Sequence, residues 1–379
     1  MSAGRNERLD VDRLLDSPST RIVVCCGSGG VGKTTTAAAL ALRAAERGRQ
    51  VVVLTIDPAR RLAQSLGLTE LDNVPRKVEG IDLAAGGRLD AMMLDMKRTF
   101  DEVVEAHATK DRARQILANP FYQALSSSFA GTQEYMAMEK LGQLRSRGDW
   151  DLIVVDTPPS RSALDFLDAP ERLGSFLDGR LIRLLAAPAR AGGRAYMRFL
   201  SAGVGAVTSA FDKILGSELL HDIQTFVSAL DTMFGGFRER ADQTYALLKR
   251  PDTAFVIVAT PEPDALREAS YFVERLEADS MPLAGLVLNR VHPDGGTMLG
   301  EHQAHVGAER LAGVRGQQLT ASLLRLYAEN RRLAARDSRR SARFAAAHPN
   351  VRVAAVPALA IDVNDLAGLR TVGDRLTAG

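Results

Sequence analysis

Cysteine is nearly absent from this chain of 379 residues, and its two cysteines, Cys25 and Cys26, are adjacent. Neighbouring residues of a strand point to opposite faces of a sheet, so a disulfide between these two would be strained. With no further cysteine, a disulfide framework and a C-x-x-C zinc site are both excluded, and no zinc is expected. This cysteine usage predicts a reducing compartment, the cytoplasm.

The chain also lacks a large charge of one sign and a long apolar run. Its net charge of +2 gives no global electrostatic reason to expect nucleic acid as a partner. Residues 1–16 are polar and contain no signal-peptide core. The apolar stretch from Phe199 to Phe211 is shorter than the roughly 20 residues of a membrane span. We expect a cytoplasmic protein and leave peripheral attachment to a membrane open.

Short apolar runs rich in β-branched residues recur along the chain. Most are continuously apolar, as is typical of strands buried on both faces of a parallel sheet. The predicted strands are Ile22–Cys26, Val51–Ile56, Ala91–Met96, Leu152–Asp156, Ala254–Ala259, Leu283–Leu288 and Val351–Val356. Helix-length segments lie between them, which indicates βαβ units with right-handed crossovers. The pattern predicts an α/β fold with a mostly parallel sheet of seven or eight strands flanked by helices.

Two of the connecting segments are too long for a simple crossover. Residues 97–150 read as two or three helices broken near Asn119-Pro120, and residues 161–250 form a larger insert. Both are interpreted as a helical subdomain within one domain spanning 19–374, preceded by a loose segment, 1–18. The apolar residues between Leu181 and Leu215 suit either a groove for a hydrophobic client helix or the core of this subdomain. The sequence leaves both open.

A phosphate-binding motif follows the first predicted strand. It reads Gly27-Ser28-Gly29-Gly30-Val31-Gly32-Lys33-Thr34 and precedes a helix-like segment, Thr34–Arg47, which is the setting of a P-loop NTPase. The glycines let backbone N–H groups approach the β-phosphate, and the helix N-terminus adds a positive dipole end. Lys33 is expected to bridge the β- and γ-phosphates, Thr34 to bind Mg²⁺, and Thr35 to contact the α-phosphate.

Two aspartates end predicted strands. Asp156 closes the apolar run that begins at Leu152, which is the Walker B arrangement that holds Mg²⁺, often through water. The rigid Thr157–Ser160 loop after it is a natural switch segment. Asp57 ends the second strand, where a carboxylate can orient or deprotonate the attacking water. It is equally suited to capping a helix that begins at Pro58.

Together these segments resemble the ArsA/Get-type branch of P-loop ATPases, which includes the arsenite-pump ATPase and the ATPase that delivers tail-anchored membrane proteins. The resemblance covers about residues 20–370. It is carried by the P-loop, by Asp57-Pro58-Ala59 and Asp156-Thr157-Pro158-Pro159-Ser160 as two switches, by Leu286-Val287-Leu288-Asn289, and by Val356-Pro357 with Asp362-Val363. It implies a Mg²⁺-dependent ATPase that works as a dimer and binds hydrophobic clients through its helical insert.

The resemblance also implies roles for individual residues. Asp57 would position the catalytic water, with Lys33 as the second catalytic residue. Asn289 would bind the adenine edge, and Pro357 would lie in the loop that closes over the base. Glu262, in Thr260-Pro261-Glu262-Pro263, matches an acidic position that contacts nucleotide across the dimer.

The chain departs from this family at the second position of the P-loop. The family usually has a lysine there that reaches the partner's nucleotide, and this chain has Ser28. Our hypothesis is a heterodimer with a paralogous ATPase that carries the lysine. A nucleotide-binding regulatory subunit and a ParA/MinD-type positioning ATPase are the alternatives. No cysteine cluster is available for arsenite, which argues against a metalloid pump.

An arginine-rich stretch extends from Leu323 to Ala347. It contains Arg325, Arg331, Arg332, Arg336, Arg339, Arg340 and Arg343. Such a run suits an anionic surface, but it is also typical of a solvated helix face.

Overall fold

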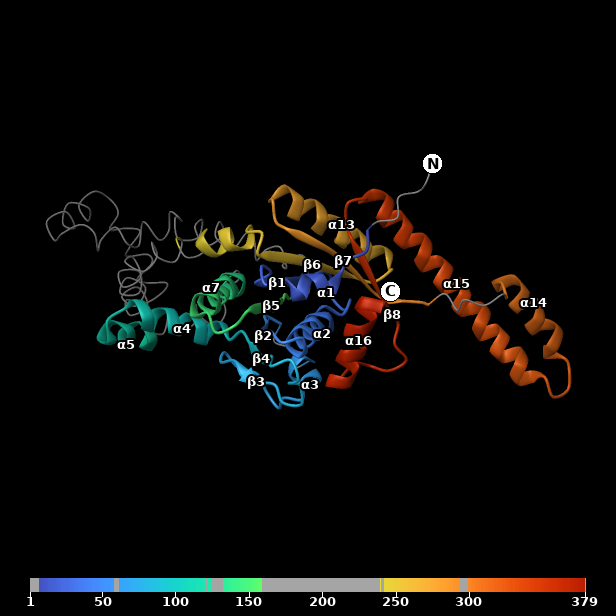
Figure 1. Ribbon diagram of the computed structural model, residues 1–379, viewed down its shortest axis with the longest axis horizontal. Helices are drawn as coiled ribbons and strands as arrows, with labels where there is room; N and C mark the ends of the chain where they lie inside the picture. The colour runs from blue at the N-terminus through green and yellow to red at the C-terminus, as the bar shows by residue number, and fades with distance from the viewer. Residues whose placement is uncertain are drawn as a thin grey trace, which may run out of the picture.

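The computed structural model describes residues 7–57, 61–119, 122–123, 132–158, 239, 242–293 and 299–378. Its centre is an eight-stranded sheet in the order β3-β4-β2-β5-β1-β6-β7-β8 (Figure 1). All neighbouring strands are parallel except β3, which runs antiparallel to β4. The strands are β1 (Ile22–Cys26), β2 (Gln50–Thr55), β3 (Arg76–Lys77), β4 (Arg88–Met93), β5 (Leu152–Asp156), β6 (Thr253–Ala259), β7 (Leu283–Val291) and β8 (Val353–Pro357). The predicted α/β fold is confirmed.

The central strands β1, β5 and β6 are buried along their whole length, which explains their continuously apolar sequences. The largest errors in predicted boundaries are at the end of β7, expected at Leu288, and at both ends of β4, which was expected at Ala91–Met96. Strand β4 ends earlier because Asp95 caps the next helix by accepting a hydrogen bond from Arg98 N. The short strand β3 was not predicted, because its two residues are exposed and basic.

Helices cover both faces of the sheet (Figure 1). Helix α2 (Lys33–Glu46) connects β1 to β2, and α13 (Pro263–Ala278) connects β6 to β7. These two crossovers run in opposite directions along the sheet, so right-handed connections place their helices on opposite faces. Helix α16 (Leu366–Ala378) packs beside α2.

The N-terminal segment packs against α2 and α16. Within the range expected to be loose, 1–18, helix α1 (Val11–Asp16) is capped by Asp10 and buries Leu15 completely. Arg43 of α2 joins the N- and C-terminal helices, because it forms ion pairs with Asp12 and Asp374. Residues 7–18 therefore contribute to the packing of the domain.

The first predicted insert is helical. It contains α4 (Met96–His107), α5 (Lys110–Ala118) and α7 (Thr132–Arg147), and α5 ends at the predicted break. A further short helix, α3 (Arg61–Ser65), follows the second strand. The predicted insert at 161–250, including the apolar residues from Leu181 to Leu215, lies outside the described residues except for 239 and 242–250.

A helical hairpin between β7 and β8 projects from the end of the sheet (Figure 1). It consists of α14 (Glu301–Ala312) and α15 (Gln318–Ala347), which pack closely on each other. The root of α15 is fastened to the domain by the buried carboxylate of Asp337, which accepts hydrogen bonds from the backbone N–H and ring Nδ1 of His292. Arg340 adds a hydrogen bond to the carbonyl of Pro261.

Candidate nucleotide-binding site

The predicted catalytic segments meet at one edge of the sheet. Strands β2, β5 and β1 are adjacent and parallel, so their carboxyl ends lie side by side. Asp57 follows β2, Asp156 ends β5, and the P-loop follows β1. Ligands of open α/β sheets bind outside the carboxyl ends of the strands. The topology therefore brings the three segments to the expected place.

The P-loop needs glycine at two positions for steric reasons. A Cβ on Gly27 would lie 2.1 Å from the carbonyl oxygen of Val258 on β6, and one on Gly32 would lie 2.3 Å from Nδ2 of Asn289. Gly32 is also the N-cap of α2 and has a φ of 96°. The loop can therefore lie against β6 and β7 only without side chains at these positions.

The remaining P-loop residues surround the N-terminus of α2. Gly29 and Gly30 are exposed, Ser28 and Thr35 are half-buried, and Val31 is buried in the core. Lys33 is buried, and its ammonium group donates a 2.8 Å hydrogen bond to the carbonyl oxygen of Ser28. Burial lowers the pKa of Lys33, and the charge of Asp156 opposes this shift. The lysine is thus kept folded over the loop.

Asp156 connects the start of α2, directly after the P-loop, to the neighbouring strand β2. Its Oδ2 accepts hydrogen bonds from the hydroxyl of Thr34 at 2.7 Å and from that of Thr55 at 2.9 Å. Its Oδ1 is buried without a hydrogen-bond partner among the described residues. Burial raises the pKa of Asp156 to about 6, against the lowering effect of the two hydroxyls.

These oxygens fit Mg²⁺. A buried carboxylate oxygen that accepts no hydrogen bond has lost its hydration without a replacement interaction, which costs free energy. A hard divalent cation, which prefers oxygen ligands, would offset this cost. The hydroxyl of Thr34 lies on the same carboxylate. The two residues that the sequence assigns to the metal are therefore in contact.

Asp57 lies close to this pair. Its backbone N–H donates to the hydroxyl of Thr55 at 3.2 Å, the same hydroxyl that donates to Asp156. The charge of Asp57 also acts on both Lys33 and Asp156. Thr55 is the residue that the sequence analysis missed, because a threonine inside an apolar strand carries no signal of its own.

Three further predicted residues lie near the carboxyl ends of β6, β7 and β8. The sequence assigns Asn289 and Pro357 to the adenine base, and Glu262 to a contact with nucleotide across the dimer. Asn289 donates from Nδ2 to the carbonyl of Val31 at 2.8 Å, so its side chain fastens the P-loop. Glu262 is the exposed N-cap of α13 and makes no capping hydrogen bond with its side chain. Pro357 is the half-buried last residue of β8. Their contacts with nucleotide stay predictions.

A family model of anion-transporting ATPases matches residues 20–306, which is most of the chain. The chain belongs to the ArsA family of anion-transporting ATPases. The ATPase get3 of Schizosaccharomyces pombe is 28% identical over 76% of this chain and 78% of its own. The ATPase ASNA1 homolog 2 of Paramecium tetraurelia is 25% identical over 73% of this chain and 78% of its own.

The putative arsenical pump-driving ATPase 1 of Aquifex aeolicus is also 25% identical, over 72% of this chain and 64% of its own. The resemblance stated from the motifs is therefore confirmed, and the chain is an ATP-binding ATPase of the Get3 type. The matched range contains the P-loop, both aspartates, Glu262 and Asn289.

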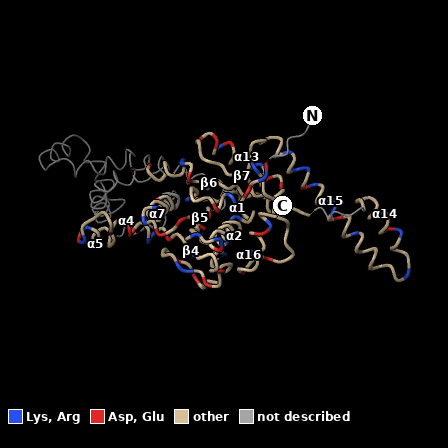
Figure 2. The backbone as a smooth tube through the Cα atoms, in the orientation of Figure 1, with Lys and Arg blue, Asp and Glu red and all other residues tan. Residues whose placement is uncertain are grey.

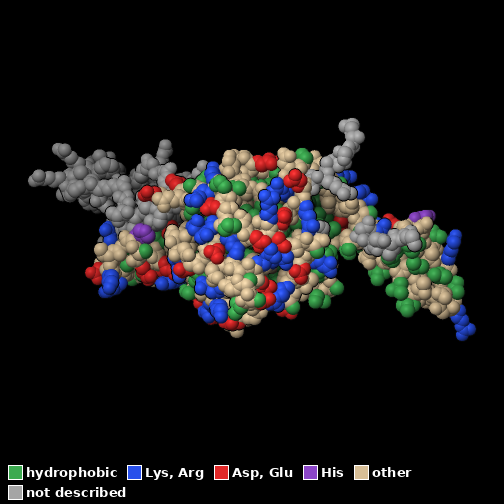
Figure 3. Space-filling model, in the orientation of Figure 1, with side chains coloured by type: hydrophobic (Ala, Val, Ile, Leu, Met, Phe, Trp, Pro, Cys, Tyr) green, Lys and Arg blue, Asp and Glu red, His purple; other side chains and the backbone are tan. Residues whose placement is uncertain are grey.

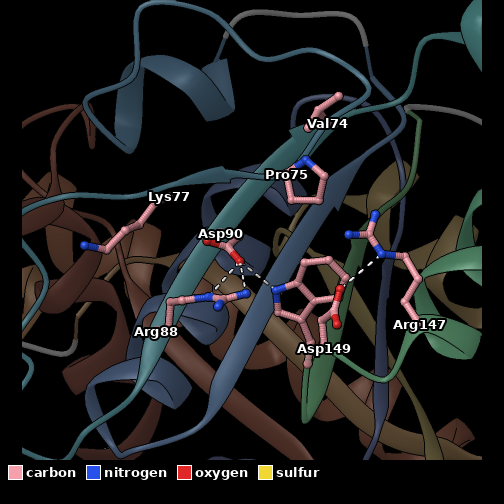
Figure 4. Close-up of a pocket in the computed structure, with 8 residues that line it drawn as sticks. Val74, Pro75, Lys77, Arg88, Asp90, Arg147 and Asp149 are labelled. Carbon is pink, nitrogen blue, oxygen red and sulfur yellow. Dashed lines mark hydrogen bonds and ion pairs between the residues drawn. The ribbon is translucent and has the colours of Figure 1, made fainter.

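This ArsA-family protein also has a pocket of about 320 Å³ at the opposite edge of the sheet (Figure 4). The pocket lies beside the start of β4 and the residues that precede β5. Asp90 holds the Arg88 guanidinium and accepts a hydrogen bond from the indole N–H of Trp150. Arg147 pairs with Asp149. The basic side chains are thus neutralised by neighbours, and we interpret this pocket as structural.

Among the described helices, none combines the length and the hydrophobicity that a membrane span requires.

Proposed function

We propose that this chain is a Mg²⁺-dependent ATPase switch that couples ATP binding and hydrolysis to rearrangement of a dimer, and thereby to the binding of hydrophobic membrane-protein clients. The observation that carries the proposal is the contact of Thr34, Asp156 and Thr55 beside the P-loop. Each of these residues comes from a different segment, so a change at the γ-phosphate can be transmitted to β2 and β5 together.

The residues have distinct roles in this proposal. The P-loop amides and Lys33 bind the phosphates, and Thr34 and Asp156 hold Mg²⁺, with Asp156 acting through water. Magnesium held there would neutralise charge on the phosphate oxygens. Lys33 leaves the carbonyl of Ser28 to reach the phosphates, and Asp57 orients the attacking water. The loop that begins at Thr157 follows Asp156 directly and acts as the second switch.

The proposed assembly is a heterodimer. Ser28 supplies no charge to a nucleotide bound by a partner, and its carbonyl accepts the chain's own Lys33. A paralogous subunit with a lysine at this position would supply the missing cation. Client binding is proposed on the resemblance to the family and on the insert predicted from the sequence at 161–250, in a cytoplasmic setting.

One experiment tests both parts. ATP turnover is measured with Mg²⁺ for the purified chain alone and with a co-expressed paralogue that carries the lysine. We expect slow turnover by the chain alone and a rise of about a hundredfold or more in the complex. A cation supplied by a partner raises the hydrolysis rate of other P-loop NTPases by at least this much. Family-typical turnover by the homodimer would contradict the heterodimer. Absence of ATP turnover under both conditions would contradict the switch itself.

Ser28 also favours a second candidate, a regulatory subunit that binds ATP and scarcely hydrolyses it. Single-turnover measurements in the complex separate the two, because only an active site in this chain would lose its hydrolysis phase on Asp57→Asn. Client binding is tested by deleting residues 181–216. Hydrophobic clients that co-purify with the full chain should then be lost.

A further inference from the structure

The free end of the hairpin formed by α14 and α15 has an unusual surface. We define the hairpin tip as residues 310–328, which include the turn between the two helices. Val314, Leu319, Leu323 and Leu326 of the tip are 46%, 72%, 56% and 55% exposed. With Leu299, they make up five of the nine large exposed hydrophobic residues in the described part of the chain. Apolar exposure concentrated in this way marks an interaction surface.

The tip is also basic. It contains Arg310, Arg315 and Arg325, and its nearest acidic residues are Glu309 and Glu329, which adjoin it on either side. None of the three arginines forms an ion pair with another described residue. Residues 301–347 as a whole contain nine arginines and four acidic residues, although the net charge of the chain is only +2. The positive charge is thus concentrated on the hairpin (Figure 2).

The hairpin does not need the tip leucines for its own packing. Its two helices meet through small buried residues, Ala304 and Ala308 of α14 and Ala321 and Ala328 of α15. Leu319, Leu323 and Leu326 are spaced by four and three residues, so they share a face of α15, and that face points away from Ala321. Figure 3 shows apolar side chains on this projecting part and basic side chains at its margin.

We propose that the hairpin tip docks on the surface of a membrane that contains anionic lipids. The tip leucines and Val314 enter the boundary between headgroups and acyl chains, and the arginines bind lipid phosphates around them. The proposal concerns the hairpin alone and does not depend on the proposed ATPase cycle.

The distribution of charge around the tip favours a bilayer over a flat protein surface. The leucines lie on one face of α15, whereas Arg310 lies on α14, Arg315 in the turn and Arg325 elsewhere on α15. A flat partner could contact only one of these faces. A bilayer entered end-on surrounds the tip and meets all of them.

The first test is co-sedimentation of the full-length protein, without nucleotide, with two kinds of vesicle. One kind is phosphatidylcholine alone, and the other contains phosphatidylcholine and phosphatidylserine in equal parts. We expect binding to the anionic vesicles only, and a decrease on raising the salt concentration. The variant L319S/L323S should bind roughly tenfold or more weakly. The matched control V74S/L83S removes two exposed apolar side chains from the opposite part of the molecule and should bind normally.

The second test uses the shortage of cysteine. Cys25 and Cys26 are buried, so a cysteine placed at Leu323 is readily labelled with a dye that responds to polarity. We expect its emission to shift to the blue with anionic vesicles, and no shift for a label at Leu83→Cys. Equal binding to both kinds of vesicle would overturn the proposal. So would a shift that depends on protein concentration and not on lipid, since it would make the tip a contact between subunits.

Discussion

The hydroxyl of Thr34 donates a 2.7 Å hydrogen bond to Oδ2 of Asp156, which joins the first turn of α2 to the end of β5. The other oxygen of this carboxylate, Oδ1, is buried with no hydrogen-bond partner among the described residues. The fold thus keeps the Asp156 carboxylate away from water, and the lost hydration costs free energy. This cost explains why the pKa of Asp156 is raised to about 6, and it makes the residue sensitive to pH.

The first prediction concerns Asp156→Asn in metal-free buffer. The folded-state pKa of about 6 exceeds the ordinary value of 3.8, so the folded protein binds the proton more tightly than the unfolded chain. Stability contributed by the protonated carboxyl is therefore present at pH 4 and is lost as the pH rises to about 6. Asp156→Asn should remove this dependence and stabilise the metal-free protein at pH 7.

Urea unfolding at pH 4.5 and pH 7 with a chelator measures the effect. Asp90→Asn is a control, because Asp90 is also buried but lies at the other edge of the sheet and is paired with Arg88. This control should destabilise the protein at pH 7. If Asp156→Asn destabilises the metal-free protein at pH 7 to the same extent, the desolvation cost assigned to Asp156 does not exist.

The second prediction is that Lys33→Ala weakens ATP binding. A charged hydrogen bond to phosphate contributes about 1.5–3 kcal/mol, so affinity should fall roughly 10- to 100-fold. Calorimetric titration with Mg²⁺ and ATP measures it. Lys140→Ala is the matched control, since Lys140 is similarly buried but pairs with Glu102 in the helical insert. An unchanged affinity for Lys33→Ala would remove the lysine from the phosphate site.

The third prediction separates the two interpretations of Asp57. Asparagine caps a helix about as well as aspartate does, so Asp57→Asn should leave stability nearly unchanged in either case. If Asp57 positions the attacking water, hydrolysis in a single turnover should fall about a hundredfold or more while ATP binding is retained. Asp95→Asn, at the N-cap of α4, is the control and should hydrolyse normally. Normal hydrolysis by Asp57→Asn would leave only the capping role.

The sequence predicted those parts of the site that depend on local spacing. Lys33 and Thr34 are found at the start of α2 because the P-loop is a contiguous motif between a strand and a helix. Asp57 and Asp156 meet because parallel strands end at one edge of the sheet, which the apolar runs already indicated. A single sequence therefore sufficed to place the P-loop and the two aspartates at one edge of the sheet, and their roles stay predictions.

Other contacts depend on which distant residues the fold brings together. Thr55 of β2 donates a hydrogen bond to Asp156 on the neighbouring strand β5, and Asn289 of β7 donates one to the P-loop. No pattern in the local sequence predicts either contact. The basic stretch near Leu323 was seen in the sequence, but its place on a projecting hairpin follows from the anchoring of Asp337 to His292. Such contacts become visible only when the strand order and the tertiary packing are known.

The fourth prediction uses two glycines to separate backbone strain from steric conflict. Gly30 and Gly32 have φ values of 76° and 96°, so alanine is strained at both positions by about 1–2 kcal/mol. A Cβ on Gly30 would meet no atom within 4 Å, whereas one on Gly32 would lie 2.3 Å from Nδ2 of Asn289. Gly32→Ala should therefore lower the free energy of unfolding more than Gly30→Ala does, and it should also impair ATP binding.

A double-mutant cycle with Asn289→Ala isolates the steric part. Asn289→Ala removes the atom that the Cβ introduced by Gly32→Ala would meet, together with the hydrogen bond to Val31. The double variant should therefore be more stable than the sum of the single effects, by about 1 kcal/mol. Urea unfolding of the four proteins gives this value. If the effects simply add, or if Gly30→Ala is as harmful as Gly32→Ala, then Asn289 does not fix the position of the P-loop.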